Sequence, residues 1–162
     1  MICLLLAACG SPARSATVAD SPHPEAVTVS PSPEAASPSP GSQVATSSSR
    51  YGRILVDRSG RTLYLFDIEF DAVVKCYGAC AASWPPFLAA SASASTSDPN
   101  LKRGLIGVSN RSDGPPQVTY NGHPLYYYVG DGSPGDIKCQ AVIEFGGGWY
   151  VIDVNGDKIG KA

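Results

Sequence analysis

The sequence is poor in histidine, methionine and charged residues, and each shortage excludes a class of protein. Two histidines and one methionine among 162 residues leave little material for an imidazole or thioether metal site. Twelve lysines and arginines against 14 aspartates and glutamates give no basic surplus, so nucleic acid is not an expected partner. No stretch reaches the ~18 apolar residues that a transmembrane helix requires. The length corresponds to about one domain.

Residues 1–8 have the character of a secretory signal whose beginning is missing. The segment is apolar and ends in small residues, which is what signal peptidases cleave. The tetrad LAAC at residues 6–9 resembles a bacterial lipobox, in which the cysteine is acylated with palmitate or a similar chain. Because no positively charged segment precedes the apolar run, we expect the true start to lie upstream. A lipid on Cys9 places the protein on the extracytoplasmic face of a bacterial membrane. The alternative is a short apolar N-terminus with a chance cysteine.

A tether is predicted over residues 9–50, beginning with the lipidated Cys9. Residues 10–50 contain 11 serines, 7 prolines and 7 alanines, and no aromatic residue. Such a segment cannot bury enough apolar surface to offset the entropy of ordering, so we expect it to be disordered. His23 lies in this segment and is expected to be solvated rather than a metal ligand.

The composition changes at Tyr51, where a globular domain covering residues 51–162 is predicted to begin. All the aromatic residues, 4 Phe, 2 Trp and 8 Tyr, lie from Tyr51 onward. A domain of ~110 residues can bury roughly two-thirds of its unfolded surface and stand alone. Helical periodicity is weak throughout, and a turn or two of helix is expected only around residues 77–83, before two prolines stop it.

An internal repeat organises this domain. Gly60–Phe66 aligns with Gly122–Tyr128, 62 residues later, and an acid follows each copy, Glu69 in the first and Asp131 in the second. A repeat this short cannot cover its own apolar face, so we expect the two copies to pack on each other.

Three antiparallel hairpins are predicted from turn signals between short β-prone runs. Residues 58–60 form the first turn, and the Asn-Gly pairs at 121–122 and 155–156 accept the positive φ angles that tight hairpin turns need. The expected extents are 52–86 and 116–140 for the two repeat copies and 141–160 for a closing hairpin. The predicted fold is therefore all-β, a small antiparallel barrel or sandwich of hairpins with an internal two-fold repeat and one short helical turn.

These patterns resemble a family of bacterial secreted-repeat lipoproteins named for a Tyr-x-(Phe/Trp/Tyr)-x-x-Asp motif. The resemblance rests on YLFDIE at 64–69, CYGACA at 76–81, WPP at 84–86, RSDG at 111–114 and QVTYNGHPLY at 117–126. It covers about residues 51–157 and implies lipid-anchored or secreted envelope proteins without an established biochemical role. Glu69 stands where the family has Asp, and Cys139 where it usually has glycine. The longer side chain of Glu69 puts any strict ligand geometry at the first copy in question.

Cysteine usage favours one disulfide. Of five cysteines, Cys3 leaves with the signal and Cys9 is acylated, which leaves three. A Cys76–Cys80 disulfide is expected outside the cytoplasm, because a helical turn places the two Cα atoms about 6 Å apart. A redox dithiol or a metal or electron-transfer ligand is the alternative, although the spacing is not Cys-x-x-Cys. Cys139 is then either a buried thiol or a competitor that pairs with Cys76 or Cys80.

The aromatic residues of the two motif copies allow two interpretations. Alternate residues of a strand share a face, so Tyr64 and Phe66 point together, as do Tyr126 and Tyr128. They are either core aromatics whose acids accept backbone N–H groups in the following turn, or a binding face suited to a glycan, a flavin-like ring or a partner strand. The candidate binding face comprises Tyr64, Phe66, Glu69, Tyr126, Tyr128 and Asp131.

No catalytic, metal or cofactor site is predicted. The sequence has no serine-nucleophile motif and no phosphate-binding glycine loop. The run from Asp153 to Asp157 lacks the glycine and the final glutamate of a calcium loop and is expected to be a hairpin turn. The predicted function is a non-enzymatic binding or structural module of the cell envelope, membrane-anchored by lipid, with an envelope glycan or protein as partner. The alternative is an extracytoplasmic redox or metal-handling protein that uses Cys76, Cys80, Cys139 and His123.

Overall fold

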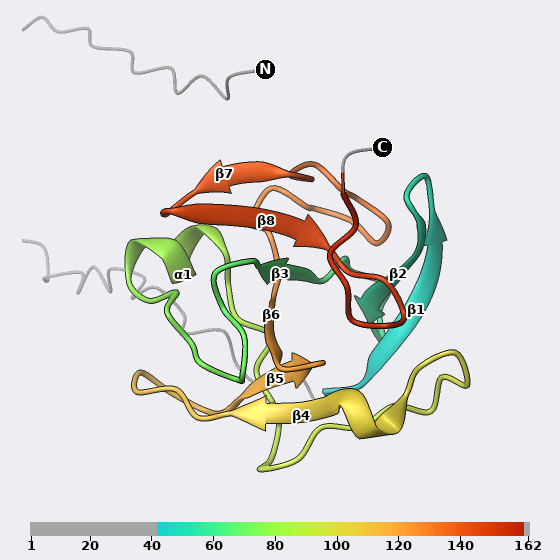
Figure 1. Cartoon of the computed structure of the whole chain (residues 1–162), viewed down its shortest axis with the longest axis horizontal. Coiled ribbons are helices and arrows are strands. Elements are labelled where there is room, and N and C mark those ends of the chain that lie inside the picture. Colours follow the sequence, from blue (N-terminus) through green and yellow to red (C-terminus); the bar gives the residue numbers. More distant parts are fainter. Residues whose placement is uncertain (1–41, 161–162) are drawn as a thin grey trace, which may run out of the picture. The chain divides into compact units, whose positions relative to one another are not determined.

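A computed structural model describes residues 42–160, which form eight β-strands and two short helical segments. The strands are β1 (Val44–Ser49), β2 (Gly52–Asp57), β3 (Tyr64–Phe66), β4 (Ile106–Ser109), β5 (Gln117–Tyr120), β6 (His123–Tyr126), β7 (Val142–Glu144) and β8 (Gly147–Val151). The helical segments are α1 (Ala79–Ser83) and the 3₁₀ turn η1 (Arg103–Leu105). The all-β class and the helical turn expected around residues 77–83 are confirmed (Figure 1).

The strands form two antiparallel sheets. Six strands lie in the order β4-β5-β6-β3-β8-β7, and β1 pairs with β2 in a separate sheet. A barrel requires its two end strands to pair with each other. Here β4 and β7 stand at opposite ends of an open sheet, so the closed barrel, one of the two predicted forms, is not the form that these strands take. β2 nevertheless lies against the larger sheet, because the N–H of Leu55 donates to the carbonyl of Ile152 at 3.0 Å.

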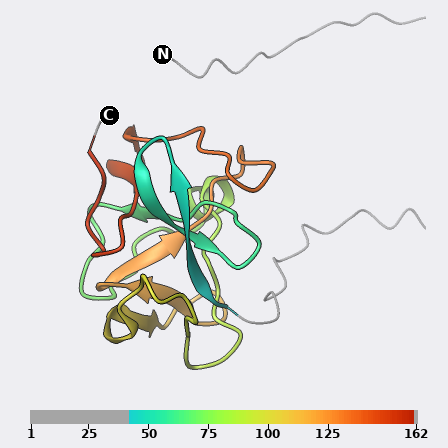
Figure 2. The ribbon, with the colours of Figure 1, turned by 90° about the vertical axis from the view of Figure 1, so that its right-hand side faces the viewer.

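Strand β1 shows that the folded part begins before Tyr51. Residues 44–49 were expected to belong to the tether. They pair instead with β2 over their whole length and form the hairpin at the front of Figure 2. Val44 is buried and donates its N–H to the carbonyl of Ser95 at 3.2 Å. Serine-rich sequence has little strand propensity of its own, and the aliphatic β2 strand supplies the hydrogen-bond partners that hold it. The predicted signal, Cys9 and the rest of the tether lie outside the described residues.

One of the three predicted hairpins forms as expected, and two are reduced to narrow bridges. β5 and β6 pair across residues 121–122, whose φ angles of 50° and 78° are those of a tight hairpin turn. The first predicted hairpin is reduced to a bridge between Val56 and Thr62, and the closing one to a bridge between Ile152 and Lys158. β3 pairs instead with β6 and β8, and β8 also pairs with β7.

The two repeat copies meet at the centre of the larger sheet. β3 of the first copy pairs with β6 of the second, with Tyr64 directly opposite Tyr126. The prediction that the copies pack on each other is therefore confirmed. The predicted starts of the two copies, residues 52 and 116, each lie one strand too late. β1 and β4 start 62 residues apart, which is the offset of the repeat, so they are the first strands of the two copies. The first copy thus begins with β1, β2 and β3, and the second begins with β4, β5 and β6.

The core has two clusters, and β2 contributes to both. Leu55 lies in one cluster with Leu63 and Leu125. Ile54 and Val56, which point the opposite way, lie in the other cluster among the tryptophans and cysteines. Because successive residues of β2 are buried on opposite sides, this strand ties the hairpin to the rest of the domain.

Candidate functional site: the paired tyrosine–acid motifs

The motif residues lie inside the molecule. Five of the six members of the candidate binding face are at most 7% exposed, and Tyr128 is half-buried. The buried members are Tyr64, Phe66, Glu69, Tyr126 and Asp131. Trp84, which follows α1, packs edge-on against Tyr64 with 5.3 Å between ring centroids. Five of the six side chains therefore lie in the core of the described part of the chain.

Each tyrosine donates to the acid of the other repeat copy. The Tyr126 hydroxyl donates to Glu69 Oε2 at 2.7 Å, and the Tyr64 hydroxyl donates to Asp131 Oδ2 at 2.7 Å. The two bonds are buried, and charge-assisted bonds of this kind are stronger than bonds between neutral groups. The motif therefore joins the two copies reciprocally across the β3–β6 pair.

The second oxygen of each carboxylate holds the loop that follows. Glu69 Oε1 accepts the backbone N–H groups of Lys75 at 2.5 Å and of Cys76 at 2.8 Å. Asp131 Oδ1 accepts only that of Lys138, at 3.0 Å. The extra methylene of Glu69 lets one oxygen reach two adjacent N–H groups. Glu69 and Asp131 thus have the same architectural role.

A lysine completes each copy. The ammonium of Lys75 donates to the carbonyl of Ile68 at 2.8 Å, and that of Lys138 donates to the carbonyl of Gly130 at 2.8 Å. In both copies the acceptor is the residue just before the motif acid. Sequence reasoning missed these lysines, although a Lys-Cys dipeptide occurs once in each copy.

Burial governs the electrostatics of the motif. It raises the pKa of Glu69 and of Asp131, and the hydrogen bonds from tyrosine and backbone N–H groups act in the opposite direction. Burial beside a carboxylate also raises the pKa of Tyr64 and of Tyr126, so both phenols stay protonated donors. In this arrangement the acids act as hydrogen-bond acceptors within the core.

A disulfide joins Cys76 and Cys80, as predicted, with a Cα–Cα distance of 5.2 Å. Both cysteines are buried, at 0% and 7% exposure. Cys139 is buried in the same core cluster and is not part of the disulfide. It follows Lys138 as Cys76 follows Lys75, so it occupies the corresponding position of the second copy.

An aromatic stack lies beside the motif. Trp149 is sandwiched between Trp84 and Phe66, with centroid distances of 4.0 and 4.2 Å and interplanar angles of 5°. Glu144 holds both indoles, since Trp84 Nε1 donates to its carboxylate at 3.1 Å and Trp149 Nε1 to its carbonyl at 3.3 Å. No local pattern marks Glu144 as a partner of Trp84, which lies 60 residues earlier in the sequence.

The remaining candidate ligands are structural. His123, the first residue of β6, has its Nδ1 2.6 Å from the carbonyl oxygen of Glu69. Asp153 Oδ1 accepts the N–H groups of Asn155 at 2.8 Å and Asp157 at 3.0 Å, which confirms the predicted hairpin turn. Within residues 42–160, no three His, Cys, Asp or Glu side chains are grouped so that they could hold a metal ion.

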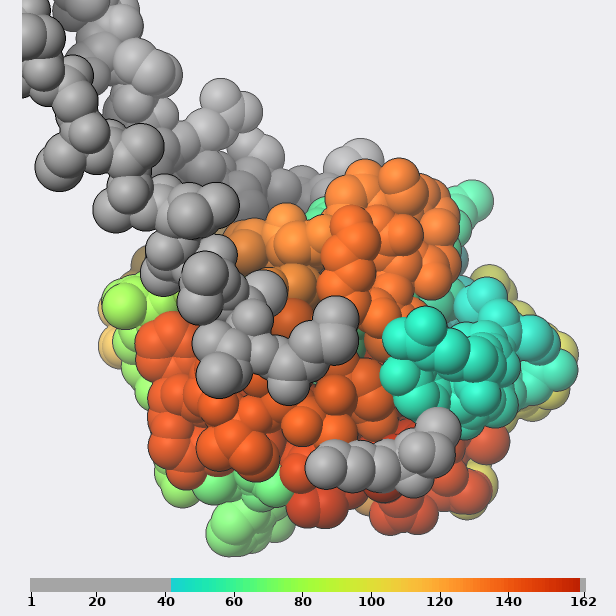
Figure 3. All heavy atoms as spheres, turned by 90° about the horizontal axis from the view of Figure 1, so that it is seen from above, coloured from blue at the N-terminus to red at the C-terminus, as the bar shows by residue number. Residues whose placement is uncertain are grey.

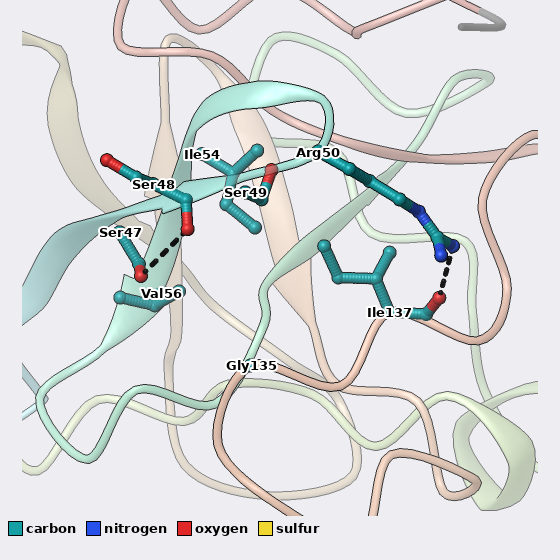
Figure 4. A pocket seen from close by; sticks show the side chains of 8 residues that line it. All are labelled: Ser47, Ser48, Ser49, Arg50, Ile54, Val56, Gly135 and Ile137. Atoms are coloured by element: carbon teal, nitrogen blue, oxygen red, sulfur yellow. Dashed lines mark hydrogen bonds between the residues drawn. The ribbon is translucent and has the colours of Figure 1, made fainter.

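The surface near the motif carries a small hollow of about 210 Å³ (Figure 4). It lies between the β1–β2 hairpin and the loop containing Gly135 and Ile137, with the buried side chains of Ile54 and Val56 among its walls. Arg50 Nη2 donates to the carbonyl of Ile137 at 3.1 Å and so spans the hollow at one end. None of the six motif side chains lines it.

Comparison with known proteins gives one match. A family described as a secreted repeat of unknown function matches residues 45–87 and 107–153, more than half of the chain. No curated protein and no solved structure matches. The matched segments begin at β1 and β4, and each contains one copy of the motif. The part of the chain that the structure describes has no helix long and apolar enough to cross a membrane. The resemblance seen in the sequence is thus confirmed, and the chain belongs to the family of secreted repeats of unknown function, which is extracytoplasmic.

Proposed function

We propose that this protein is a non-catalytic binding or structural module of the bacterial cell envelope, held at the membrane by a lipid on Cys9. Membership of a secreted family supports a location outside the cytoplasm. The LAAC tetrad at residues 6–9 supports the anchor. A single acyl chain binds membranes only marginally, so stable anchoring requires the several chains that lipoprotein maturation adds.

The reciprocal pairing of the motif carries the non-catalytic part of the proposal. A general acid or base must reach a substrate by hydrogen bonding. The carboxylates of Glu69 and Asp131 are buried and accept bonds from tyrosine and backbone N–H groups instead. The family signature therefore serves to join two repeat copies, and recognition of a partner falls to the surface.

Lipidation is tested by the mass of the tryptic peptide from Cys9 to Arg14, isolated from the membrane fraction of the bacterial host. We expect that peptide to carry a diacylglyceryl group and an amide-linked acyl chain, and the protein to enter the detergent phase of a phase separation. The Cys9→Ser variant should move to the aqueous phase, with Cys3→Ser as the matched control that stays with the detergent. Recovery of an unmodified peptide from Cys9 to Arg14 contradicts the anchor.

The redox or metal alternative gains no support from any arrangement in residues 42–160. Cys76 and Cys80 are joined and buried, and His123 contacts a backbone carbonyl. Native mass spectrometry of the purified Cys9→Ser chain, which carries no lipid, separates the two functions. We expect the mass of the polypeptide with one disulfide. Additional mass that is lost on denaturation favours the alternative.

A further inference from the structure

Charge is distributed unevenly along the folded part of the chain. Residues 42–66, which contain β1, β2 and β3, carry four arginines and one aspartate. Residues 67–160 carry six basic and ten acidic residues. The aspartate of the first segment, Asp57, is buried and accepts the Tyr127 hydroxyl at 2.9 Å. The β1–β2 hairpin with its following turn is thus positive on a domain that is otherwise negative.

Three of these arginines are exposed and form what we call the arginine surface: Arg50, Arg53 and Arg58. The fourth, Arg61, is half-buried and lies over the ring of Tyr127 at 4.1 Å. The ion pairs found among residues 42–160 join Arg111 to Asp113, Lys138 to Asp136 and Lys158 to Asp67, and they include no arginine of the hairpin.

Neutral acceptors hold two of the three arginines of this surface. Arg50 donates to the carbonyl of Ile137, and Arg53 Nη1 donates to Thr46 Oγ1 at 3.4 Å. Arg58 borders a hollow of about 300 Å³ together with Ser97 and Asp98. A guanidinium has five donors in a planar fork that matches phosphate oxygens. Two of these guanidinium groups lie on the β1–β2 hairpin, at one edge of the described part, and the third lies in the turn after it, an arrangement that suits a phosphate-rich surface (Figure 3).

We propose that the arginine surface docks the domain onto the anionic phospholipid headgroups of the membrane that carries the anchor, an inference that rests on the proposed lipidation of Cys9. Thirty-four residues separate Cys9 from Val44, the first residue of β1. At full extension they span at most about 120 Å, so the anchor leaves the hairpin within reach of the bilayer. The acidic surplus of residues 67–160 is repelled by anionic lipid and turns the hairpin toward it.

The test uses the full chain with Cys9→Ser, so that no lipid contributes, and vesicles of phosphatidylglycerol mixed with phosphatidylcholine or of phosphatidylcholine alone. We expect cosedimentation with the anionic vesicles only. Binding should weaken as salt rises from about 10 mM to about 150 mM, because the Debye length falls from about 30 to about 8 Å. Because Cys9 is absent, this result is independent of whether the anchor itself is formed.

Variants locate the effect. Each basic side chain near an anionic membrane strengthens binding about five-fold, so Arg50→Gln, Arg53→Gln and Arg58→Gln together should lower the partition coefficient about 100-fold. The matched control, Lys102→Gln, Arg103→Gln and Lys161→Gln, removes the same charge outside the hairpin and should lower the partition coefficient less than about ten-fold. Equal losses in both variants, no binding to anionic vesicles, or equally tight binding to soluble polyphosphate overturns the proposal. Unchanged thermal unfolding of both variants shows that the fold is intact.

Discussion

Tyr64 and Tyr126 differ from ordinary core aromatics in that each donates to an acid of the other repeat copy. Their hydroxyls have carboxylate acceptors at 2.7 Å, and these bonds span 67 and 57 residues of sequence. A buried carboxylate without donors is costly, so each acid depends on the tyrosine opposite it as well as on its own loop. At the scale of the residue, the buried acid of each copy therefore depends on the tyrosine of the other copy for a hydrogen bond.

Removing one hydroxyl should expose this dependence. Tyr126→Phe leaves Glu69 buried with one donor fewer, and we expect a loss of about 1–3 kcal/mol in the free energy of unfolding. The bond from Tyr126 lowers the pKa of Glu69, so the variant should also show a higher Glu69 pKa in an NMR titration. Tyr51→Phe is the control, because the Tyr51 hydroxyl makes no hydrogen bond within residues 42–160. A loss no greater than that of Tyr51→Phe would show that the bond contributes nothing.

The helix α1 shows at the scale of the element how a weak segment is held. It has five residues, and its N-terminus has no side-chain cap. A helix this short is not stable alone. The disulfide crosses its first turn, and Arg111 Nη2 donates to the carbonyl of Cys76 at 3.1 Å from the second repeat copy. The N–H of Val129 donates to the carbonyl of Ser83 at 3.2 Å and secures the other end.

Opening the disulfide should therefore weaken the domain without changing its fold. Cys76→Ala with Cys80→Ala removes a five-residue closed loop, for which chain entropy predicts a loss of about 2 kcal/mol. Urea unfolding of the double variant measures it. Cys139→Ala is the matched control, since it removes a buried thiol and keeps the disulfide. If the double variant matches wild type in stability while an activity disappears, the disulfide is functional rather than structural.

For the whole molecule, acidic groups divide into two sets with opposite effects. Burial raises the pKa of Glu69 and Asp131, so the folded state binds their protons more tightly than the unfolded state does. The two groups therefore add stability in acid, and that stability is lost as the pH rises through their pKa values in the folded state. Burial also acts to raise the pKa of Asp98, but bonds from Thr46 and Asn100 outweigh it and lower that pKa to about 2. Asp98 therefore adds stability above its unfolded pKa of about 3.9 that is lost as the pH falls to about 2.

The Asp98→Asn variant tests this sign. At neutral pH we expect it to be about 1 kcal/mol less stable than wild type, an amount reduced by the partial exposure of Asp98. The difference should shrink as the pH falls from about 4 to about 2, measured by urea unfolding at each pH. Asp71→Asn, at an exposed turn, is the control and should change the free energy of unfolding at neutral pH by less than about 0.5 kcal/mol. A difference that stays constant over this range would show that Asp98 is not the group that titrates.

Features with a local signature were predictable. The repeat follows from an offset of 62 residues, the disulfide from a four-residue spacing, and the β5–β6 turn from one Asn-Gly pair. Strand β1 was not predicted because its serine-rich sequence resembles the tether before it. Such a segment becomes a strand through pairing with β2, which the local sequence does not reveal.

By itself, the sequence determined an all-β repeat protein of a secreted family, with aromatic strands and an acid in each copy. The fold class, the repeat and the positions of the aromatic residues and acids all follow from neighbouring residues and their periodicity. Only the tertiary structure decided that each tyrosine donates to the opposite acid and that Glu144 accepts the indole N–H of the distant Trp84. These contacts depend on which strands become neighbours, and strand order is set by the packing of the entire core rather than by any local pattern.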